Sequence, residues 1–134
     1  MVSKPSRKEG TEMNIAITSC GREKDSQPDM SFGRAKWFIF YDEDTGRFEA
    51  RENSDNVEAA HGAGIQAAQR VADFGADVVL TGNIGPNAFR TLKAAGIRIF
   101  LFGKDRKSVA EVLQGWKAGE FSEAAGATNK GHRA

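Results

Sequence analysis

The sequence DVVLTGNIGPNAF, residues 77–89, decides the fold of this 134-residue chain. Its first five residues, DVVLT, form a short apolar run rich in β-branched side chains, which is typical of a buried strand. The residues TGNIGPN then change the pattern from strand to turn, and Pro86 stands where the first position of a helix tolerates proline. A strand that passes through a glycine-rich turn into a helix is the unit of α/β folds, so we expect a sheet covered by helices.

The chain on the C-terminal side repeats this unit. The helix that Pro86 opens is expected to end at Gly96, and the apolar run IRIFLF at residues 97–102 predicts the next strand. Ser108 and Glu111 have the spacing of a capping box, which predicts that a third helix starts there.

The chain on the N-terminal side begins with three strands. The apolar runs MNIAITS at 13–19 and KWFIFYD at 36–42 predict two of them, and the turn EDTG leads into a third at 47–53, RFEAREN. The third alternates, so we expect Phe48 and Ala50 to face the core and the strand to lie toward an edge of the sheet.

A first helix is predicted at residues 62–74, where apolar side chains recur at helical spacing before Gly75. The element order is therefore βββαβαβα. Because crossovers between parallel strands are right-handed and place helices over the sheet, the predicted fold is α/β, with a mixed five-stranded sheet between helical layers.

Length and composition restrict the class of protein. We expect a disordered N-terminal arm at 1–12, one domain at 13–121 and a flexible C-terminal tail at 122–134. Nineteen Lys and Arg against eighteen Asp and Glu give a net charge of +1, which favours neither nucleic acid nor a membrane surface as a partner. The chain contains neither a membrane-spanning apolar run nor a secretory signal pattern, so a cytoplasmic location is expected.

Glycines gather at two junctions in front of predicted helices, HGAG at 61–64 and TGNIGPN at 81–87. Helix N-termini favour anions, and glycine lets a ligand approach the backbone. Because ligands collect at the carboxyl ends of parallel strands, the loop that begins at Ser19 and Cys20 should open at the same crevice. Neither junction has the spacing of a phosphate-binding loop or a dinucleotide fingerprint, so tight turns without a ligand, and a Cys20 that is merely a small buried residue, stay open.

Several segments, taken together, resemble one known family. They are FGRAKWF at 32–38, the acidic hairpin 42–46, Asn53, HGAG at 61–64, GNIGPNAF at 82–89, AGI at 95–97 and SVAE at 108–111. In this order they resemble the dinitrogenase iron–molybdenum cofactor biosynthesis family over roughly residues 13–121. The resemblance implies a three-layer, ribonuclease H-like α/β fold, and a protein that binds or carries a metal–sulfur cluster and is not an enzyme.

The resemblance also implies a binding site at the two junctions, because metal–sulfur clusters are usually polyanions. The expected cofactor-binding residues are Ser19, Cys20, Ser31, His61, Gly62, Gly64, Gly82, Asn83, Gly85 and Asn87. Cys20 and His61 are the candidate metal ligands, since thiolate and imidazole suit soft metal centres. Several cluster-binding relatives carry His where this chain has Ser31, and we hypothesise that Cys20 partly replaces it.

The expected cargo is an iron–sulfur or molybdenum-containing metal–sulfur cluster, exchanged with donor and acceptor proteins. We expect a monomer or a weak homodimer that pairs through the edge strand ending near Asn53. A regulatory or scaffold domain that binds a phosphate-bearing metabolite or a protein partner is the alternative, and a metal-dependent nuclease is a third. A nuclease needs carboxylates gathered at one end of the sheet, whereas residues 13–19 contain none and Asp77 lies at the opposite end of its strand from Gly82.

Overall fold

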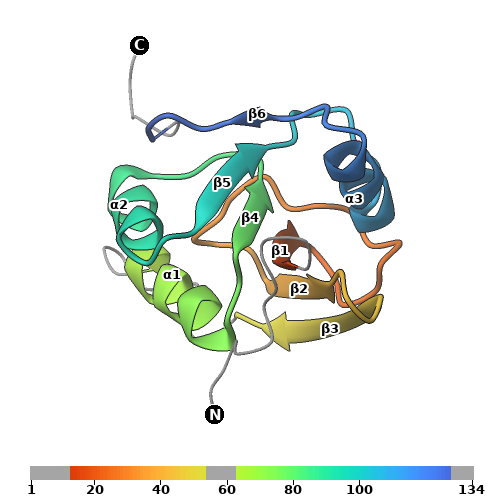
Figure 1. Ribbon diagram of the computed structural model, residues 1–134, viewed down its shortest axis with the longest axis horizontal. Helices are drawn as coiled ribbons and strands as arrows, with labels where there is room; N and C mark the ends of the chain where they lie inside the picture. Colours follow the sequence, from red (N-terminus) through yellow and green to blue (C-terminus); the bar gives the residue numbers. More distant parts are fainter. Residues whose placement is uncertain (1–12, 54–62, 128–134) are drawn as a thin grey trace.

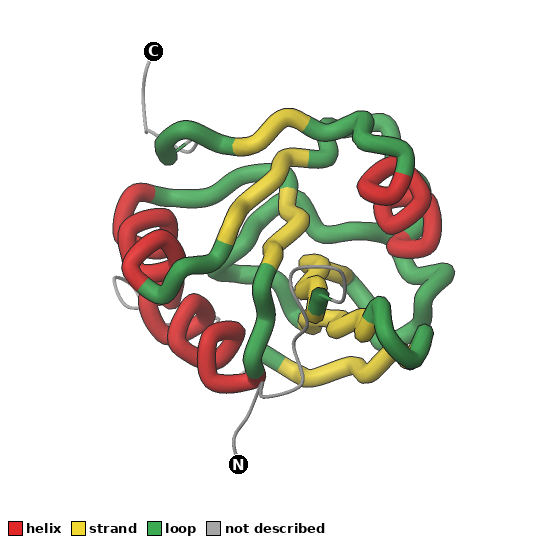
Figure 2. Tube along the Cα trace, viewed as in Figure 1, coloured by secondary structure: helices red, strands yellow, loops and turns green. Residues whose placement is uncertain are grey.

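The computed structural model describes residues 13–53 and 63–127. One mixed sheet lies between helices α1 and α2 on one face and helix α3 on the other (Figure 1). The elements are β1 (Asn14–Ser19), β2 (Trp37–Asp42), β3 (Arg47–Glu52), α1 (Ala63–Phe74), β4 (Val78–Thr81), α2 (Pro86–Ala94), β5 (Arg98–Leu101), α3 (Val109–Lys117) and β6 (Ser122–Glu123). Figure 2 shows the strands in the middle and the helices at the two sides.

The strand order is β3-β2-β1-β4-β5-β6. Strand β4 pairs in parallel with both β1 and β5, whereas β2 runs antiparallel to β1 and β3. The parallel strands therefore end at the same side of the sheet, at Ser19, Thr81 and Leu101. We call this side the carboxyl edge.

Strand β4 explains why DVVLT behaves as a central strand. All four residues of β4 are buried, because helices cover both faces of the sheet at this position. Val79 packs into the core beneath α1 and α2, whereas Val78 and Leu80 pack into the core beneath α3. The two cores together fix the position of the turn that follows Thr81.

The eight predicted elements occur in the predicted order, but the prediction of five strands was wrong. A sixth strand, β6, pairs antiparallel with β5, so that Ser122 lies opposite Leu101. The Ala124 N–H donates to the Ile99 carbonyl at 2.8 Å, and Ala124 is buried. Two residues are too few to show periodicity, and the edge of β5 supplies their pairing, which is why the sequence does not predict β6. Residues 1–12 and 128–134 lie outside the described part of the chain.

Phe48 lies on the predicted face of β3, beside Ala50, but it is not buried in the core. Phe48 is 36% exposed on β3, at the margin of the sheet, where it packs on the Tyr41 ring with centroids 4.9 Å apart. Its neighbour Ala50 is half-buried on the same face. None of the helices in the described part of the chain has the length and apolar character needed to cross a bilayer.

Candidate functional site

The loop after β1 folds back along the end of its own strand and then along the start of the next loop. Ser19 forms an antiparallel bridge with Pro28, and the Asp29 N–H donates to the Thr18 carbonyl at 3.0 Å. Further on, Ser31 forms a parallel bridge with Asn83. The structure therefore brings the segments after β1 and β4 together at the carboxyl edge.

Two hydrogen bonds hold this second contact. The Asn83 N–H donates to the Met30 carbonyl at 2.6 Å, and the Phe32 N–H donates to the Asn83 carbonyl at 3.1 Å. Both bonds use backbone atoms of Asn83, so they do not engage its side chain. Asn83 is exposed to solvent. The Ser31 hydroxyl accepts from the Arg34 N–H at 3.1 Å, which leaves its proton available for a further acceptor.

Two buried threonines support the loop from below, and the sequence analysis did not identify them. The Thr18 hydroxyl donates to the Asp29 carbonyl at 2.6 Å and lies 3.0 Å from the Thr81 hydroxyl. Both threonines are fully buried. A threonine near the end of each of two neighbouring predicted strands is the signal that could have found them.

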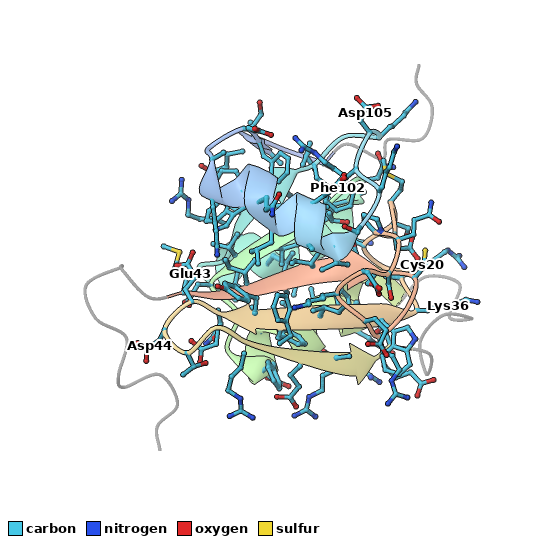
Figure 3. All side chains as sticks on the ribbon, turned by 90° about the vertical axis from the view of Figure 1, so that its right-hand side faces the viewer. Cys20, Lys36, Glu43, Asp44, Phe102 and Asp105 are labelled. Atoms are coloured by element: carbon cyan, nitrogen blue, oxygen red, sulfur yellow. The ribbon has the colours of Figure 1, made fainter. Side chains whose placement is uncertain are left out.

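Asn53 directly follows β3 and forms hydrogen bonds to the segment that precedes β2. Its N–H donates to the Lys36 carbonyl at 2.8 Å, and its side-chain amide donates to the Ala35 carbonyl at 2.8 Å. Asn53 is fully buried. It therefore fixes the chain that leads into β2, and Lys36, which precedes β2, lies at the carboxyl edge on the same side as Cys20 (Figure 3).

The glycines of the predicted site serve different purposes. A Cβ on Gly82 would lie 2.6 Å from Met30 Sδ and 3.0 Å from Met30 Cα, so the two loops are closely packed there and a side chain would displace Met30. A Cβ on Gly64 would lie 3.2 Å from the Cβ of Ala88, so the first turns of α1 and α2 are in contact. A Cβ on Gly85 would meet no atom within 4 Å.

Helix α2 begins without a cap. Gly85 is its N-cap residue, no side chain caps the helix, and Pro86 at the first position has no N–H. The first helical hydrogen bond runs from the Phe89 N–H to the Gly85 carbonyl at 3.0 Å. The N–H groups of Asn87 and Ala88 are therefore not used by the hydrogen bonds of the helix itself. Asn87 is exposed, whereas Ala88 is buried, so Asn87 is the residue of this helix start that a ligand can reach.

The Asn87 side chain is turned along the helix, where its Oδ1 accepts from the Arg90 guanidinium at 2.5 Å. Asn87 itself is exposed. The Asn87 side chain is therefore already engaged with Arg90. The group of Asn87 that a ligand would contact is its backbone N–H at the start of the helix.

Cys20 is exposed, and its thiol lies 3.9 Å from the Pro28 carbonyl. Partial desolvation by the loop is the main cause that raises its pKa, the Asp29 carboxylate raises it further, and Lys36 acts in the opposite direction. The thiol is therefore protonated at neutral pH. A metal that bound the sulfur would have to displace this proton.

Asp29 is a second residue that the sequence analysis did not place in the site. Its Oδ1 accepts from the Ser31 N–H at 3.0 Å, and its charge acts on the Cys20 thiol. Its side chain therefore neighbours both Cys20 and Ser31. These are the two residues of the hypothesis that Cys20 partly replaces the His that relatives carry at the position of Ser31. No periodic pattern in the loop 21–31 marks this position.

The other expected residues fall into two groups. Ser19 is fully buried, and its hydroxyl donates to the Gly21 carbonyl at 2.6 Å, so it closes its own turn. His61 and Gly62 lie outside the described residues, and their role in binding stays a prediction.

Two pockets lie away from the predicted crevice. The larger, with a volume of about 410 Å³, is formed between β2, β3 and α1. Its lining residues are Phe38, Phe40, Arg51, Glu52, Arg70, Asp73 and Phe74. The second, of about 170 Å³, lies beside it and also contains none of the expected ligands.

The carboxylates of the described residues are not arranged for two-metal catalysis. Within residues 13–53 and 63–127, no three side chains of His, Cys, Asp or Glu gather in a way that could hold a metal ion. Asp77 lies at the opposite edge, where its Oδ2 accepts from the Asn14 N–H at 3.0 Å. Glu43 and Asp44 also lie at the end of the sheet opposite Cys20 and Lys36 (Figure 3).

Comparison with solved structures shows close relatives. The chain is 38% identical to the orange protein of Desulfovibrio gigas, solved in its apo form, with a TM-score of 0.83 over 87% of this chain and 97% of that one. It is 33% identical to a Thermotoga protein solved as a candidate NifB protein, with a TM-score of 0.77 and the same coverage of both chains.

Comparison at the sequence level agrees. The chain is 30% identical over 71 residues to an uncharacterised protein of Methanocaldococcus jannaschii, a match that covers 52% of this chain and 60% of that protein, less than two thirds of its length. Residues 13–119 match the family described as dinitrogenase iron-molybdenum cofactor. Since this match takes in both loops of the carboxyl edge and all three helices, the chain belongs to the dinitrogenase iron–molybdenum cofactor family.

Proposed function

We propose that this protein is a non-catalytic carrier that holds an anionic metal–sulfur cluster, of the iron–sulfur or iron–molybdenum type, at the carboxyl edge. The observation that carries the proposal is the start of α2, where Gly85 supplies no capping side chain, Pro86 has no N–H, and Asn87 is exposed. A helix N-terminus with free donors favours an anion through its hydrogen bonds and its dipole.

The comparisons support a binding function on this framework. The family takes its description from the iron–molybdenum cofactor, a metal–sulfur cluster. The Desulfovibrio gigas relative was solved in an apo form, the term for a protein without its bound group. We further propose that the fold is ribonuclease H-like, because the order β3-β2-β1-β4-β5 with an antiparallel β2 has that connectivity.

The described residues fit an anionic cargo that must be released again. Asn83 offers an exposed amide beside the Ser31 hydroxyl, and both lie in the loops that precede or adjoin α2. Cys20 supplies a sulfur ligand once it loses its proton, and its raised pKa makes this bond easier to give up. His61 is proposed as the second metal ligand. Donor and acceptor proteins in the cytoplasm are the proposed partners.

The test is anaerobic incubation of the purified chain with ferrous iron, sulfide and molybdate, followed by desalting, visible absorbance, and metal and sulfide analysis. We expect the chain to retain metal and sulfide together. A chain that retains neither under any donor condition contradicts the proposal, and a chain that binds only inorganic phosphate favours the regulatory alternative.

A matched pair of variants locates the site. Gly85 has the extended backbone of an ordinary N-cap residue and has space for a side chain, so Gly85→Asp and Gly85→Asn both fit and both can cap α2. Only Gly85→Asp adds a negative charge. We expect it to bind the cluster about tenfold more weakly than Gly85→Asn, a difference of about 1.4 kcal/mol. Equal affinities would place the cargo elsewhere.

A further inference from the structure

Strand β3 ends the sheet on one side. In the described part of the chain it pairs with β2 and with no other strand. Its sequence, RFEARE, is highly charged, and only Ala50 is half-buried while the other five residues are exposed. Charges on an edge strand usually prevent it from pairing with another chain. On β3, however, the order of the charges favours pairing with the β3 strand of a second copy in one register.

The hydrogen bonds to β2 fix which residues of β3 are available. The Asn53 N–H donates to the Lys36 carbonyl, so this pair is of the hydrogen-bonded kind. Hydrogen-bonded and non-bonded pairs alternate along an antiparallel ladder. Arg47, Glu49 and Arg51 therefore direct their backbone groups toward β2. The backbone N–H and C=O groups of Phe48, Ala50 and Glu52 point away from β2, toward the free edge.

An outward-facing residue can lie opposite only another outward-facing residue when a second β3 pairs antiparallel with the first. Three registers are centred on the strand. In the central one, Ala50 lies opposite Ala50 of the second copy and Glu49 lies opposite Arg51. Shifting the strands by one step in either direction places Glu49 opposite Glu49, or Arg51 opposite Arg51. Like charges directly opposite each other are destabilising, so among these three registers the charges select the central one.

Side-chain geometry agrees with this register. Arg51 Nη2 and Glu49 Oε2 already form an ion pair within the chain at 2.8 Å, with the two side chains 55% and 54% exposed. A second copy would bring its own Glu49 and Arg51 beside them, so that four charges alternate in sign. Ala50, a small residue, would lie at the two-fold axis, where the backbones approach each other.

We propose that β3 is a self-association edge, through which two copies of this chain pair antiparallel about Ala50 to form one continuous sheet. Because the two β3 strands run in opposite directions, the two carboxyl edges point away from each other and both stay open. The pairing buries little apolar surface, so the dimer is transient and exchanges quickly at low concentration.

The first test is analytical ultracentrifugation of the full chain over a concentration series that reaches about 1 mM, where weak interfaces of this kind become populated. We expect Glu49→Arg to weaken association about tenfold, because it places Arg opposite Arg twice. The double variant Glu49→Arg with Arg51→Glu exchanges both charges and should restore it. A wild-type chain that stays monomeric throughout, or a single variant that associates normally, overturns the proposal.

The second test reports the register. In a Cys20→Ser background, Ala50→Cys should form an intermolecular disulfide under mild oxidation, because residue 50 meets its own copy. Phe48→Cys is the matched control: it lies opposite Glu52 of the second copy and should cross-link at least tenfold more slowly. Circular dichroism shows that each variant is folded. Equal cross-linking at the two positions, or faster cross-linking at Phe48→Cys, overturns the proposed pairing.

Discussion

The helices α2 and α3 both follow a parallel strand and both begin at the carboxyl edge, but their first turns are completed differently. At α3, Ser108 Oγ accepts from the Glu111 N–H at 3.1 Å, and Glu111 Oε1 accepts from the Lys107 N–H at 2.9 Å. These two bonds form the capping box that the sequence predicted. The protein thus supplies its own acceptors at this helix start.

The loop after β1 completes the cap of α3. The Val109 N–H donates to the Ser26 carbonyl at 2.9 Å, and the Ala110 N–H donates to the Lys24 carbonyl at 2.8 Å. All three N–H groups at the start of α3 are therefore used within the chain. Among the described residues, helix α2 has no corresponding acceptors, so within them the same edge of the sheet carries one closed helix start and one open one. The difference shows that a helix start on this fold is closed by two things, its own capping residues and a loop that reaches it from another strand.

The largest expected effect comes from breaking the packing that holds the open start in place. Gly82→Val should lower the free energy of unfolding by about 2–3 kcal/mol, because its side chain would overlap Met30. Urea unfolding followed by circular dichroism measures this. Gly85→Ala is the control, since its Cβ meets no atom, and it should change stability by less than about 0.5 kcal/mol. Equal losses at both positions would show that the loops do not pack as described.

A smaller effect is expected on cluster affinity when a negative charge is added to one helix start or to the other. Gly85→Asp adds a carboxylate to the open start of α2, and Ser108→Asp adds one to the closed start of α3 while keeping a capping oxygen. We expect the cluster affinity to fall about tenfold for Gly85→Asp and less than about twofold for Ser108→Asp, since screening limits a charge that is not in contact with the cargo. Similar losses for both variants would mean that long-range charge, and not the α2 start, governs binding.

The next effect is the change in stability when the capping side chain of α3 is removed or one is added to α2. Ser108→Ala removes the acceptor of the Glu111 N–H and should cost about 1 kcal/mol of stability. Gly85→Ser adds a capping hydroxyl to α2 and should gain a few tenths of a kcal/mol. Thermal unfolding of the two variants beside the wild type measures both. A stability gain from Ser108→Ala, or a loss of more than about 1 kcal/mol from Gly85→Ser, would contradict the assignment of the two starts.

This contrast also shows how far the sequence predicts the molecule. The capping box at Ser108 and the strand-turn-helix pattern around Gly82 depend on neighbours in the chain, so both were predicted and the element order followed. The contact between Ser31 and Asn83 depends on a polar loop without periodicity that returns to the end of a distant strand. No local pattern encodes such a contact. For the same reason, the close packing at Gly82 could not be separated from a ligand-binding role.

The family resemblance supplied the candidate ligands, and the structure distinguishes among them by what each side chain already does. Ser19 uses its hydroxyl within its own turn, whereas Cys20 and Asn83 remain exposed. Asp29 entered the site only through the structure, because its effect on Cys20 arises from a turn of the loop that the sequence does not specify.

The smallest expected effect is on the reactivity of Cys20. Its pKa is raised first by partial desolvation and then by Asp29, so less thiolate is present at about pH 8 than for an ordinary cysteine. Asp29→Asn removes the charge but keeps an oxygen for the Ser31 N–H. The variant should therefore react faster with iodoacetamide at this pH, and the midpoint of its rate–pH curve should move to lower pH. Asp25→Asn, a charge change in the same loop that does not act on the thiol, is the matched control.

The same shift fixes the sign of the effect on stability. Because the folded chain holds the Cys20 proton more tightly than the unfolded chain, the stability that this contributes is present below the pKa of the unfolded thiol and is lost as the pH rises through the folded pKa. Asp29→Asn should make this alkaline loss smaller, and it should also strengthen cluster binding, since a repelling charge beside Ser31 is removed. Identical rate–pH curves for Asp29→Asn and the wild type would show that the charge of Asp29 does not act on the thiol, which would leave partial desolvation and Lys36 to set its pKa. Asp29 would then have no part in the release of a cluster from Cys20.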